Sequence, residues 1–161
     1  MIPVAKIQPL PVFYRHTVTE DLLDVMGHMN IHGYMYIFNG GALNFAEAFG
    51  LTQEFIDQER EGIFALEHHL RYLAEVRLGE TVAVHHRVFR RTAKRVHFMQ
   101  FMVNETRPNL ACTLEVVNSY ANLALRRTAE FPPQIASWFD HLIAQHQQLD
   151  WDAPLCGVMN P

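Results

Sequence analysis

The sequence is poor in cysteine and has no hydrophobic run long enough to cross a bilayer. Two cysteines, Cys112 and Cys156, among 161 residues exclude a disulfide framework and lead us to expect a reducing compartment, the cytoplasm. No apolar stretch approaches the roughly 20 residues of a transmembrane helix. The segment around Pro3, Pro9 and Pro11 lacks the apolar core of a signal peptide. We therefore expect no membrane partner.

Positive charge is scarce as well. Lys and Arg number 13 against 17 Asp and Glu, and the resulting net charge of −4 disfavours a nucleic-acid partner. Hydrophobic residues make up 49% and charged residues 19%, which excludes a disordered or fibrous chain. We therefore predict one globular domain over residues 1–161. The ten histidines make histidine a background residue here, so each one has to be argued separately.

A long amphipathic helix is predicted behind an N-terminal strand and a loop. Residues 11–19 are rich in β-formers, and residues 20–30 show no period. Apolar side chains then recur at i, i+3, i+4 and i+7 over residues 31–49. Asn30 stands where an N-cap belongs, and Gly50 stands where the helix should end.

Two glycines inside this helix, Gly40 and Gly41, indicate that it is closely enclosed. Each costs about 1 kcal/mol relative to alanine in a helix interior. That cost is tolerable where another backbone comes close, so we expect such an approach at this point of the helix.

The second half of the sequence predicts consecutive strands and a final helix. Alternating polarity and turn residues place them at residues 63–73, 82–88, 95–103, 110–125 and 133–148. Strands joined by short turns form a largely antiparallel sheet. The fold class is therefore α+β, with a curved antiparallel sheet wrapped around one long central helix.

The loop ahead of the long helix carries a recognisable motif. Residues 24–30 read Asp-Val-Met-Gly-His-Met-Asn. This resembles the signature of the hotdog-fold acyl-CoA thioesterases of the 4-hydroxybenzoyl-CoA thioesterase type, in which Asp, two residues and Gly-His-x-Asn precede the central helix. The element order matches that family over about residues 11–130, and further similarities lie at Tyr72, Glu75, Gly79, Phe131 and Pro132.

Two positions depart from the family pattern. Ile31 stands where members often have a second Asn, and Leu22 stands where they often have an acidic residue, with Asp21 one place earlier. We therefore expect the active-site entrance to differ from that of the family, and with it the accepted acyl group.

The resemblance implies hydrolysis of an acyl-CoA thioester with Asp24 as nucleophile or general base. The alternative is that Asp24 has no catalytic role and caps a turn of the loop. The unpaired N–H groups and positive dipole at a helix start form an oxyanion site, which points to Ile31, His32 and Gly33. Glycine at position 33 would also let a ligand approach the backbone.

Other candidates flank this motif or lie on the next strand. His28 either orients the substrate or the aspartate, or holds the loop together. Asn30 and Tyr34 are candidates for substrate contact, although Asn30 fits an N-cap better than a catalyst. His68 falls on the apolar face of its strand, as a core histidine or part of an acyl pocket. Glu67 points the other way, toward a dimer partner in related enzymes.

Four cations gather at the turn between the third and fourth strands. They are Arg90, Arg91, Lys94 and Arg95, and they predict a clamp on the phosphates of coenzyme A, with a solvated hairpin tip as the alternative. We expect no metal site, because the histidine pairs 68–69 and 85–86 supply too few ligands at zinc spacing. Both cysteines are expected to be inert.

The function predicted is therefore an acyl-CoA thioesterase that needs no cofactor beyond the coenzyme A of its substrate. The resemblance implies a homodimer or a tetramer made of two dimers, because exposed sheet edges are usually paired. Two alternatives remain: a non-catalytic acyl-CoA-binding protein of the same fold, and, with less support, an enoyl-CoA hydratase or dehydratase.

Overall fold

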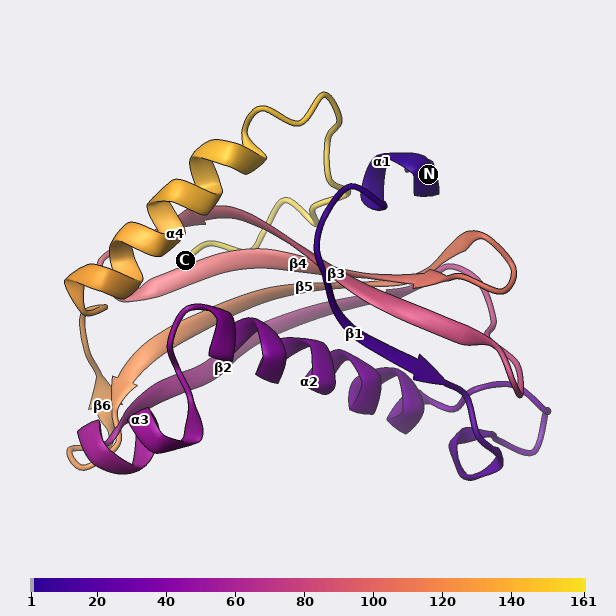
Figure 1. The fold of residues 1–161 in the computed structure, drawn as a ribbon, viewed down its shortest axis with the longest axis horizontal. Helices are drawn as coiled ribbons and strands as arrows, with labels where there is room; N and C mark the ends of the chain where they lie inside the picture. Colours follow the sequence, from indigo (N-terminus) through magenta and orange to yellow (C-terminus); the bar gives the residue numbers. More distant parts are fainter. Residues whose placement is uncertain (1) are drawn as a thin grey trace. The chain divides into compact units, whose positions relative to one another are not determined.

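The computed structural model describes residues 2–161 and has the predicted mixture of one long helix and an antiparallel sheet (Figure 1). The sheet has the strand order β1-β3-β4-β5-β2, and β6 pairs with β5. In chain order the elements are α1 (Val4–Ile7), β1 (Val12–Thr17), η1 (Glu20–Leu22), α2 (Ile31–Ala48), α3 (Gln53–Glu59), β2 (Glu61–Tyr72), β3 (Thr81–Arg91), β4 (Arg95–Asn104), β5 (Asn109–Asn122), β6 (Arg127–Thr128) and α4 (Pro133–His146).

Most predicted boundaries agree with this structure to within a few residues. The helix predicted from residue 31 is α2, and it ends two residues before Gly50, whose φ of +91° suits glycine. Four short elements, α1, η1, α3 and β6, were not predicted. None of the helices described in residues 2–161 is long and apolar enough to cross a membrane.

The residues form two compact units, and strands β2 to β5 contribute to both. The first unit runs to Phe45 and adds Leu70–His86 and Gln100–Leu114. The second unit comprises Ala46–His69, Arg87–Met99 and Glu115–Pro161.

In the first unit, α2 packs directly onto strand side chains. A Cβ atom on Gly41 would lie 2.6 Å from Val84 Cγ1, and one on Gly40 would lie 2.8 Å from the Tyr14 ring. The predicted close approach is therefore real, but side chains make it and not a backbone. Around it, the Phe13 ring meets Phe45 edge-on at 5.1 Å.

These two glycines provide a matched pair of stability variants. Val84 is fully buried, so its side chain cannot retreat, and we expect Gly41→Ala to destabilise the protein by about 1–3 kcal/mol through overpacking. Tyr14 is partly exposed and can shift, so Gly40→Ala should be close to neutral because alanine is the better helix former. Urea unfolding of both variants checks this, and equal destabilisation would contradict it.

An ion-pair network secures the turns of the first unit. The Glu80 carboxylate accepts hydrogen bonds from the Arg107 guanidinium, from Asn104 Nδ2 at 2.7 Å and from the Arg77 backbone N–H at 2.9 Å. The Arg107 pairing lowers the pKa of Glu80 to about 2 despite its burial. Glu80 therefore stays ionised, and it ties the loop before β3 to the turn after β4.

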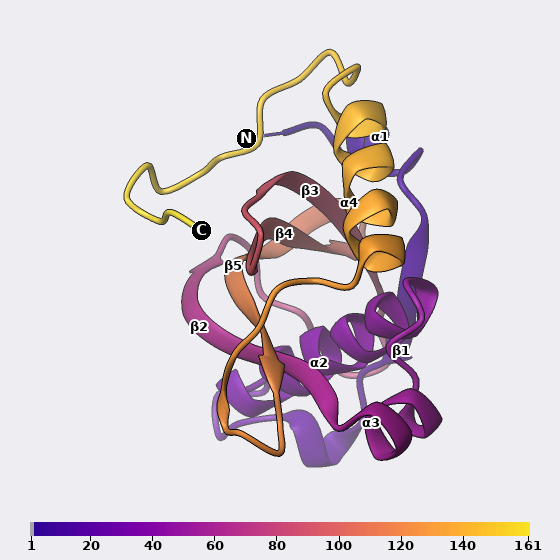
Figure 2. The same cartoon turned by 90° about the vertical axis from the view of Figure 1, so that its left-hand side faces the viewer.

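In the second unit, α4 is held by aromatic packing and one strong ion pair. The Phe139 ring lies 4.9 Å from Phe49 and 5.3 Å from Phe131. Arg91 of β3 donates to both carboxylate oxygens of Asp140 on α4. Beyond α4 the chain runs to residue 161 without a helix or strand, as the yellow trace in Figure 2 shows.

The predicted core face of β2 is wrong. Leu66 and Tyr72 are 49% and 50% exposed, and His68 is exposed too, although the alternation placed all three inward. β2 forms the end of the sheet, next to β5, and the burial of the central strands β4 and β5 does not extend to its middle. In this strand order β2 and β3, which carry the histidine pairs 68–69 and 85–86, are not neighbours.

Candidate active site

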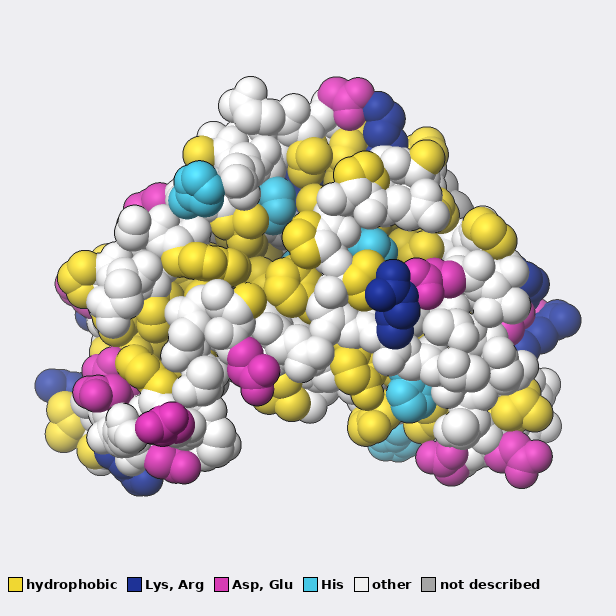
Figure 3. All heavy atoms as spheres, in the orientation of Figure 1, with side chains coloured by type: hydrophobic (Ala, Val, Ile, Leu, Met, Phe, Trp, Pro, Cys, Tyr) yellow, Lys and Arg dark blue, Asp and Glu magenta, His cyan; other side chains and the backbone are white. Residues whose placement is uncertain are grey.

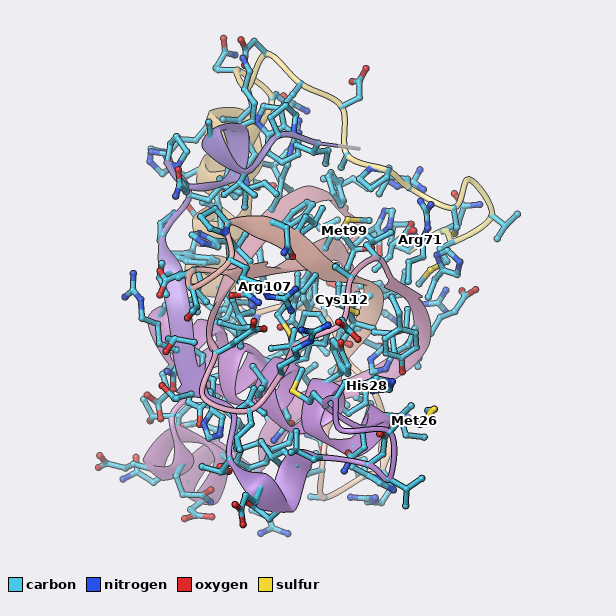
Figure 4. The ribbon with its side chains drawn as sticks, turned by 90° about the vertical axis from the view of Figure 1, so that its right-hand side faces the viewer. Met26, His28, Arg71, Met99, Arg107 and Cys112 are labelled. Carbon is cyan, nitrogen blue, oxygen red and sulfur yellow. The ribbon has the colours of Figure 1, made fainter. Side chains whose placement is uncertain are left out.

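The motif loop ahead of α2 is a tight turn whose backbone requires glycine. The Asp24 N–H donates to the His28 carbonyl at 2.9 Å, and the Gly27 N–H donates to the Asp24 carbonyl at 3.1 Å. Gly27 has φ of +80°, in the left-handed region that favours glycine. Figure 4 shows Met26 and His28 on this loop. The turn brings the side chains at its two ends together.

Asp24 and His28 face each other across the turn. Asp24 Oδ2 lies 3.3 Å from His28 Nδ1, while Asp24 Oδ1 accepts the Met26 backbone N–H at 2.8 Å. The two side chains are 25% and 31% exposed. Asp24 thus caps the turn, as the structural alternative predicted, and the same carboxylate remains accessible from solvent.

Asn30 is the predicted N-cap of α2. Its side-chain oxygen accepts the Gly33 N–H at 2.8 Å, and its side-chain nitrogen donates to the Leu23 carbonyl at 3.2 Å. This corrects the expectation for Gly33, whose N–H already has an acceptor. The N–H groups of Ile31 and His32 lie ahead of the first intrahelical bond, from Tyr34 N–H to the Asn30 carbonyl, and they remain the oxyanion candidates.

Gly33 also has a different role from the one expected. A Cβ atom there would lie 2.6 Å from Met29 Cγ and 3.3 Å from Leu22 Cβ. The missing side chain therefore makes room for the protein's own Met29 under the helix, and not for a ligand.

A cavity of about 440 Å³ opens in the first unit at the start of α2. Five of the predicted residues line it: Asp24, His28, Asn30, Ile31 and Tyr34. Sequence reasoning missed the rest of the wall: Met26, Met29, Tyr72, Leu73, Ala74 and Glu75. Tyr72 and Glu75 stood out only as points of family similarity, and their order in the chain gave no sign that they meet the helix start.

The two tyrosines form the rigid part of this wall. Tyr34 donates its hydroxyl proton to the Ala74 carbonyl at 3.2 Å, and its ring meets that of Tyr72 edge-on at 5.0 Å. Burial raises the pKa of Tyr34 to about 12, so its hydroxyl stays neutral and keeps this bond. Burial likewise raises the pKa of the nearby Cys112 thiol to about 12, which makes it the inert cysteine predicted.

The side chain of His32 lies in a second cavity of the same unit. This cavity measures about 460 Å³ and is also lined by His16, Thr19, Asp21, Leu22, Asn30 and Tyr36. Of His32, then, only the backbone N–H belongs with the oxyanion candidates. Asn30 lines both cavities.

The remaining predicted residues belong to the second unit. Glu67 and His68 are exposed in the middle of β2. Arg90 donates to the Met159 carbonyl at 3.0 Å and to Asn160 Oδ1 at 2.8 Å.

Arg90 and Arg91 thus have partners within the chain, because Arg91 pairs with Asp140 on α4. Lys94 and Arg95 remain exposed, and Lys94 lines a surface hollow with Arg127. On the face shown in Figure 3, basic side chains of the described residues stand scattered, several beside acidic ones.

Comparison with known proteins agrees with the loop motif and the strand order. Residues 17–139 match the model of the thioesterase-like superfamily, and the chain belongs to this family. The fold is therefore the predicted α+β hotdog fold. The narrower resemblance to the 4-hydroxybenzoyl-CoA type has no such support.

Individual relatives are distant in sequence. The chain is 27% identical over 139 residues to an L-carnitine dehydrogenase/betainyl-CoA thioesterase of Agrobacterium fabrum, a match that covers 86% of this chain and 28% of that protein. The chain thus spans little more than a quarter of that curated relative.

Two solved structures superpose on most of the chain. The structure of a hypothetical protein of Staphylococcus aureus in complex with CoA superposes with a TM-score of 0.83 at 26% identity, and the match covers 94% of this chain and 96% of that one. A 1,4-dihydroxy-2-naphthoyl-CoA thioesterase from Synechocystis has a TM-score of 0.70 at 14% identity, with 80% and 95% covered, and shares the fold. Family membership supports the enzyme class predicted, thioester hydrolase.

Proposed function

We propose that this protein hydrolyses an acyl-CoA thioester in the cavity at the start of α2. One observation carries the proposal: the accessible carboxylate of Asp24 and the first turn of α2 at Ile31 line the same cavity. Thioester hydrolysis needs a group that activates water or attacks the carbonyl, and donors that hold the developing oxyanion. The Asp24 carboxylate would meet the first need and the first turn of α2 the second. The chain's membership of the thioesterase-like superfamily supports this assignment.

In the proposed reaction, the thioester carbonyl oxygen points at the N–H groups of Ile31 and His32. Asp24 either takes a proton from the attacking water or attacks the carbonyl carbon itself. The carbon–sulfur bond then breaks, and the CoA thiolate leaves and takes up the proton that the water releases. Where Asp24 attacks directly, water hydrolyses the resulting acyl-aspartate anhydride, so either route ends with the free acid and an unmodified Asp24. His28 positions the Asp24 carboxylate from 3.3 Å. Exposed Lys94 and Arg95 remain the candidates for the CoA phosphates.

We propose a compact, cationic acyl group as the substrate class. The curated relative carries the name betainyl-CoA thioesterase, and a betainyl group ends in a trimethylammonium. Here the cavity combines the rings of Tyr34 and Tyr72 with the carboxylate of Asp24. Glu75 also lines the cavity, and its carboxylate is paired with the Arg77 guanidinium. Aromatic rings and carboxylates attract a quaternary ammonium by about 0.5–2 kcal/mol per ring contact.

A thiol-release assay tests both parts of this proposal, the hydrolysis of the thioester and the preference for a cationic acyl group. The matched pair of substrates is betainyl-CoA and 3,3-dimethylbutanoyl-CoA, in which carbon replaces the charged nitrogen at nearly the same size. We expect hydrolysis of both, with kcat/KM about tenfold higher for betainyl-CoA because of its charge. Tyr72→Leu should lower the betainyl rate more than the neutral one.

Different outcomes separate the two parts. Equal rates for the two substrates would discard the cationic acyl group and leave the thioesterase in place. Tight binding of CoA esters without thiol release, across short, long, branched and aromatic acyl groups, would favour the non-catalytic binder. Hydration of an enoyl-CoA in a parallel assay would favour the hydratase.

We also propose that the exposed edge of β2 pairs with a second copy of this chain. β2 has one strand neighbour, and it exposes Leu66 and Tyr72. An unpaired edge with apolar side chains is a surface that proteins usually cover. A homodimer would cover it and bring a second cavity wall near Tyr72, and Glu67 and His68 would then lie at the interface.

A further inference from the structure

Three side chains with metal-binding chemistry meet in the second unit. His69 comes from β2, Glu115 from β5 and Cys156 from the C-terminal segment. One ring nitrogen, one carboxylate oxygen and the thiol sulfur all lie within 4.8 Å of one another. This cluster shares no residue with the cavity at the start of α2.

Glu115 is the fixed point of the cluster. Its side chain is 1% exposed, and its Oε1 lies 2.8 Å from His97 Nε2 while its Oε2 accepts the Cys156 backbone N–H at 2.8 Å. Arg90 donates its Nε–H to His97 Nδ1 at 3.4 Å. A guanidinium can only donate, so His97 Nδ1 is the acceptor and Nε2 carries the proton given to Glu115.

A second imidazole nitrogen near Glu115 is His69 Nδ1. It lies 3.9 Å from Glu115 Oε2, beyond a hydrogen bond, and it is shielded from solvent without a hydrogen-bond partner among residues 2–161. Two ligands bound at ~2.0–2.2 Å to one tetrahedral ion lie roughly 3.4 Å apart. The observed spacing therefore suits a cation between the two groups after a small adjustment.

We propose that His69, Glu115 and Cys156 bind a zinc ion, with the fourth position open to water. The donor set of one thiolate, one imidazole and one carboxylate is a borderline-soft one, which favours zinc over magnesium or calcium. Binding releases the thiol proton of Cys156 to solvent and forms the zinc–sulfur bond, with no change of oxidation state. The hydrogen bond from His97 orients the carboxylate ligand, as such outer partners do in zinc proteins.

The zinc ion would attach the C-terminal segment, which carries Cys156, to strands β2 and β5. That segment is already held where Arg87 donates to the Trp151 carbonyl at 2.6 Å and Arg90 donates to the Met159 carbonyl at 3.0 Å. Cys156 lies between these two anchors in the sequence. The spacing of residues in the sequence could not reveal the site, because its three ligands come from distant segments. Of the histidine pairs 68–69 and 85–86, only His69 contributes a ligand.

Cobalt(II) is the spectroscopic probe for the test. The full-length protein, free of any histidine tag and stripped with a chelator, is titrated with cobalt(II), and zinc is then added in competition. We expect one equivalent of cobalt with a near-ultraviolet thiolate charge-transfer band, displaced by zinc. Cys156→Ser should remove the band and weaken zinc binding at least about tenfold. Cys112→Ser is the matched control and should leave both unchanged, because Cys112 is buried in the first unit.

His69→Gln tests the second ligand, and it should weaken zinc binding in the same way while the thiolate band shifts. The proposal is overturned if wild-type protein shows no thiolate band. It is also overturned if zinc binds Cys156→Ser and His69→Gln as it binds wild type, because exposed histidines would then hold the ion. The readouts use no acyl-CoA, so failure here leaves the proposed thioesterase untouched.

Discussion

Asp24→Asn is expected to lower kcat/KM for the hydrolysed acyl-CoA by about 10²–10⁴-fold, the range typical of a lost general base. The amide keeps a side-chain oxygen that can accept the Met26 N–H, now at 2.8 Å, so the turn and the fold should survive. The amide cannot take a proton from water or form the acyl intermediate. Thiol release under single-substrate kinetics measures the loss, and urea unfolding verifies that the variant is folded.

Asp21→Asn is the matched control for this variant. Asp21 is an exposed carboxylate only three residues earlier, and it lines the second cavity. Its loss should change kcat/KM less than about twofold, because surface charges of this kind contribute little. Full turnover by Asp24→Asn, or an equal loss in both variants, would remove Asp24 from the reaction and leave it as a turn cap.

The loop and the helix of this site could be predicted because their signals are local. The Asn30 cap, the 3.6-residue period and the Gly50 stop act within a few residues of chain. α2 begins at the residue they predict and ends one residue earlier than predicted. The aspartate-to-asparagine motif of residues 24–30 likewise forms one turn. Local hydrogen bonds determine these features, so a single sequence contains them.

The far wall of the cavity and the edge of the sheet could not be predicted in this way. Tyr72 and Ala74 reach the start of α2 through the strand order, which places β2 beside β5 and not beside β3. The alternation in β2 predicted a buried face that includes His68. Such a pattern marks the apolar face of a strand, but it is the same whether the core of the chain or a second copy covers that face.

The sequence also could not predict which groups the charged side chains bind. Arg90 and Arg91 look like a free cationic turn when read with Lys94 and Arg95. Their guanidinium groups instead bond to Asn160 and Asp140, which lie near the other end of the chain. A cluster of like charges predicts a ligand site only when the structure leaves the charges without such partners.

His146 should make the protein lose stability steeply as the pH falls from about 6.5 toward 4. This histidine is 6% exposed at the end of α4, and its Nδ1 accepts the Val88 backbone N–H at 2.9 Å. Burial, with a smaller contribution from the neighbouring Arg87 guanidinium, lowers its pKa to about 4.

The sign follows from proton binding. Unfolded histidine has a pKa of about 6.5, so between pH 6.5 and 4 the unfolded state takes up a proton that the folded state excludes. The free energy of unfolding therefore falls with falling pH, by about 2 kcal/mol at pH 5 and about 3 kcal/mol near pH 4 relative to pH 7.5. Protonation would place a positive charge beside Arg87 and leave the Val88 N–H without its acceptor.

Urea unfolding at pH 7.5, 6 and 5, at one protein concentration, measures this slope. His146→Asn offers a neutral acceptor that does not titrate, and it should flatten the wild-type slope by about 2 kcal/mol between pH 7.5 and 5. His141→Asn, on the exposed side of the same helix, should keep it. Part of the wild-type slope should persist in both variants, because burial also lowers the pKa of His85 in the first unit. An unchanged slope in His146→Asn would show that the His146 imidazole does not remain neutral when folded, and the His146–Val88 bond would then lose its role in holding α4 to β3.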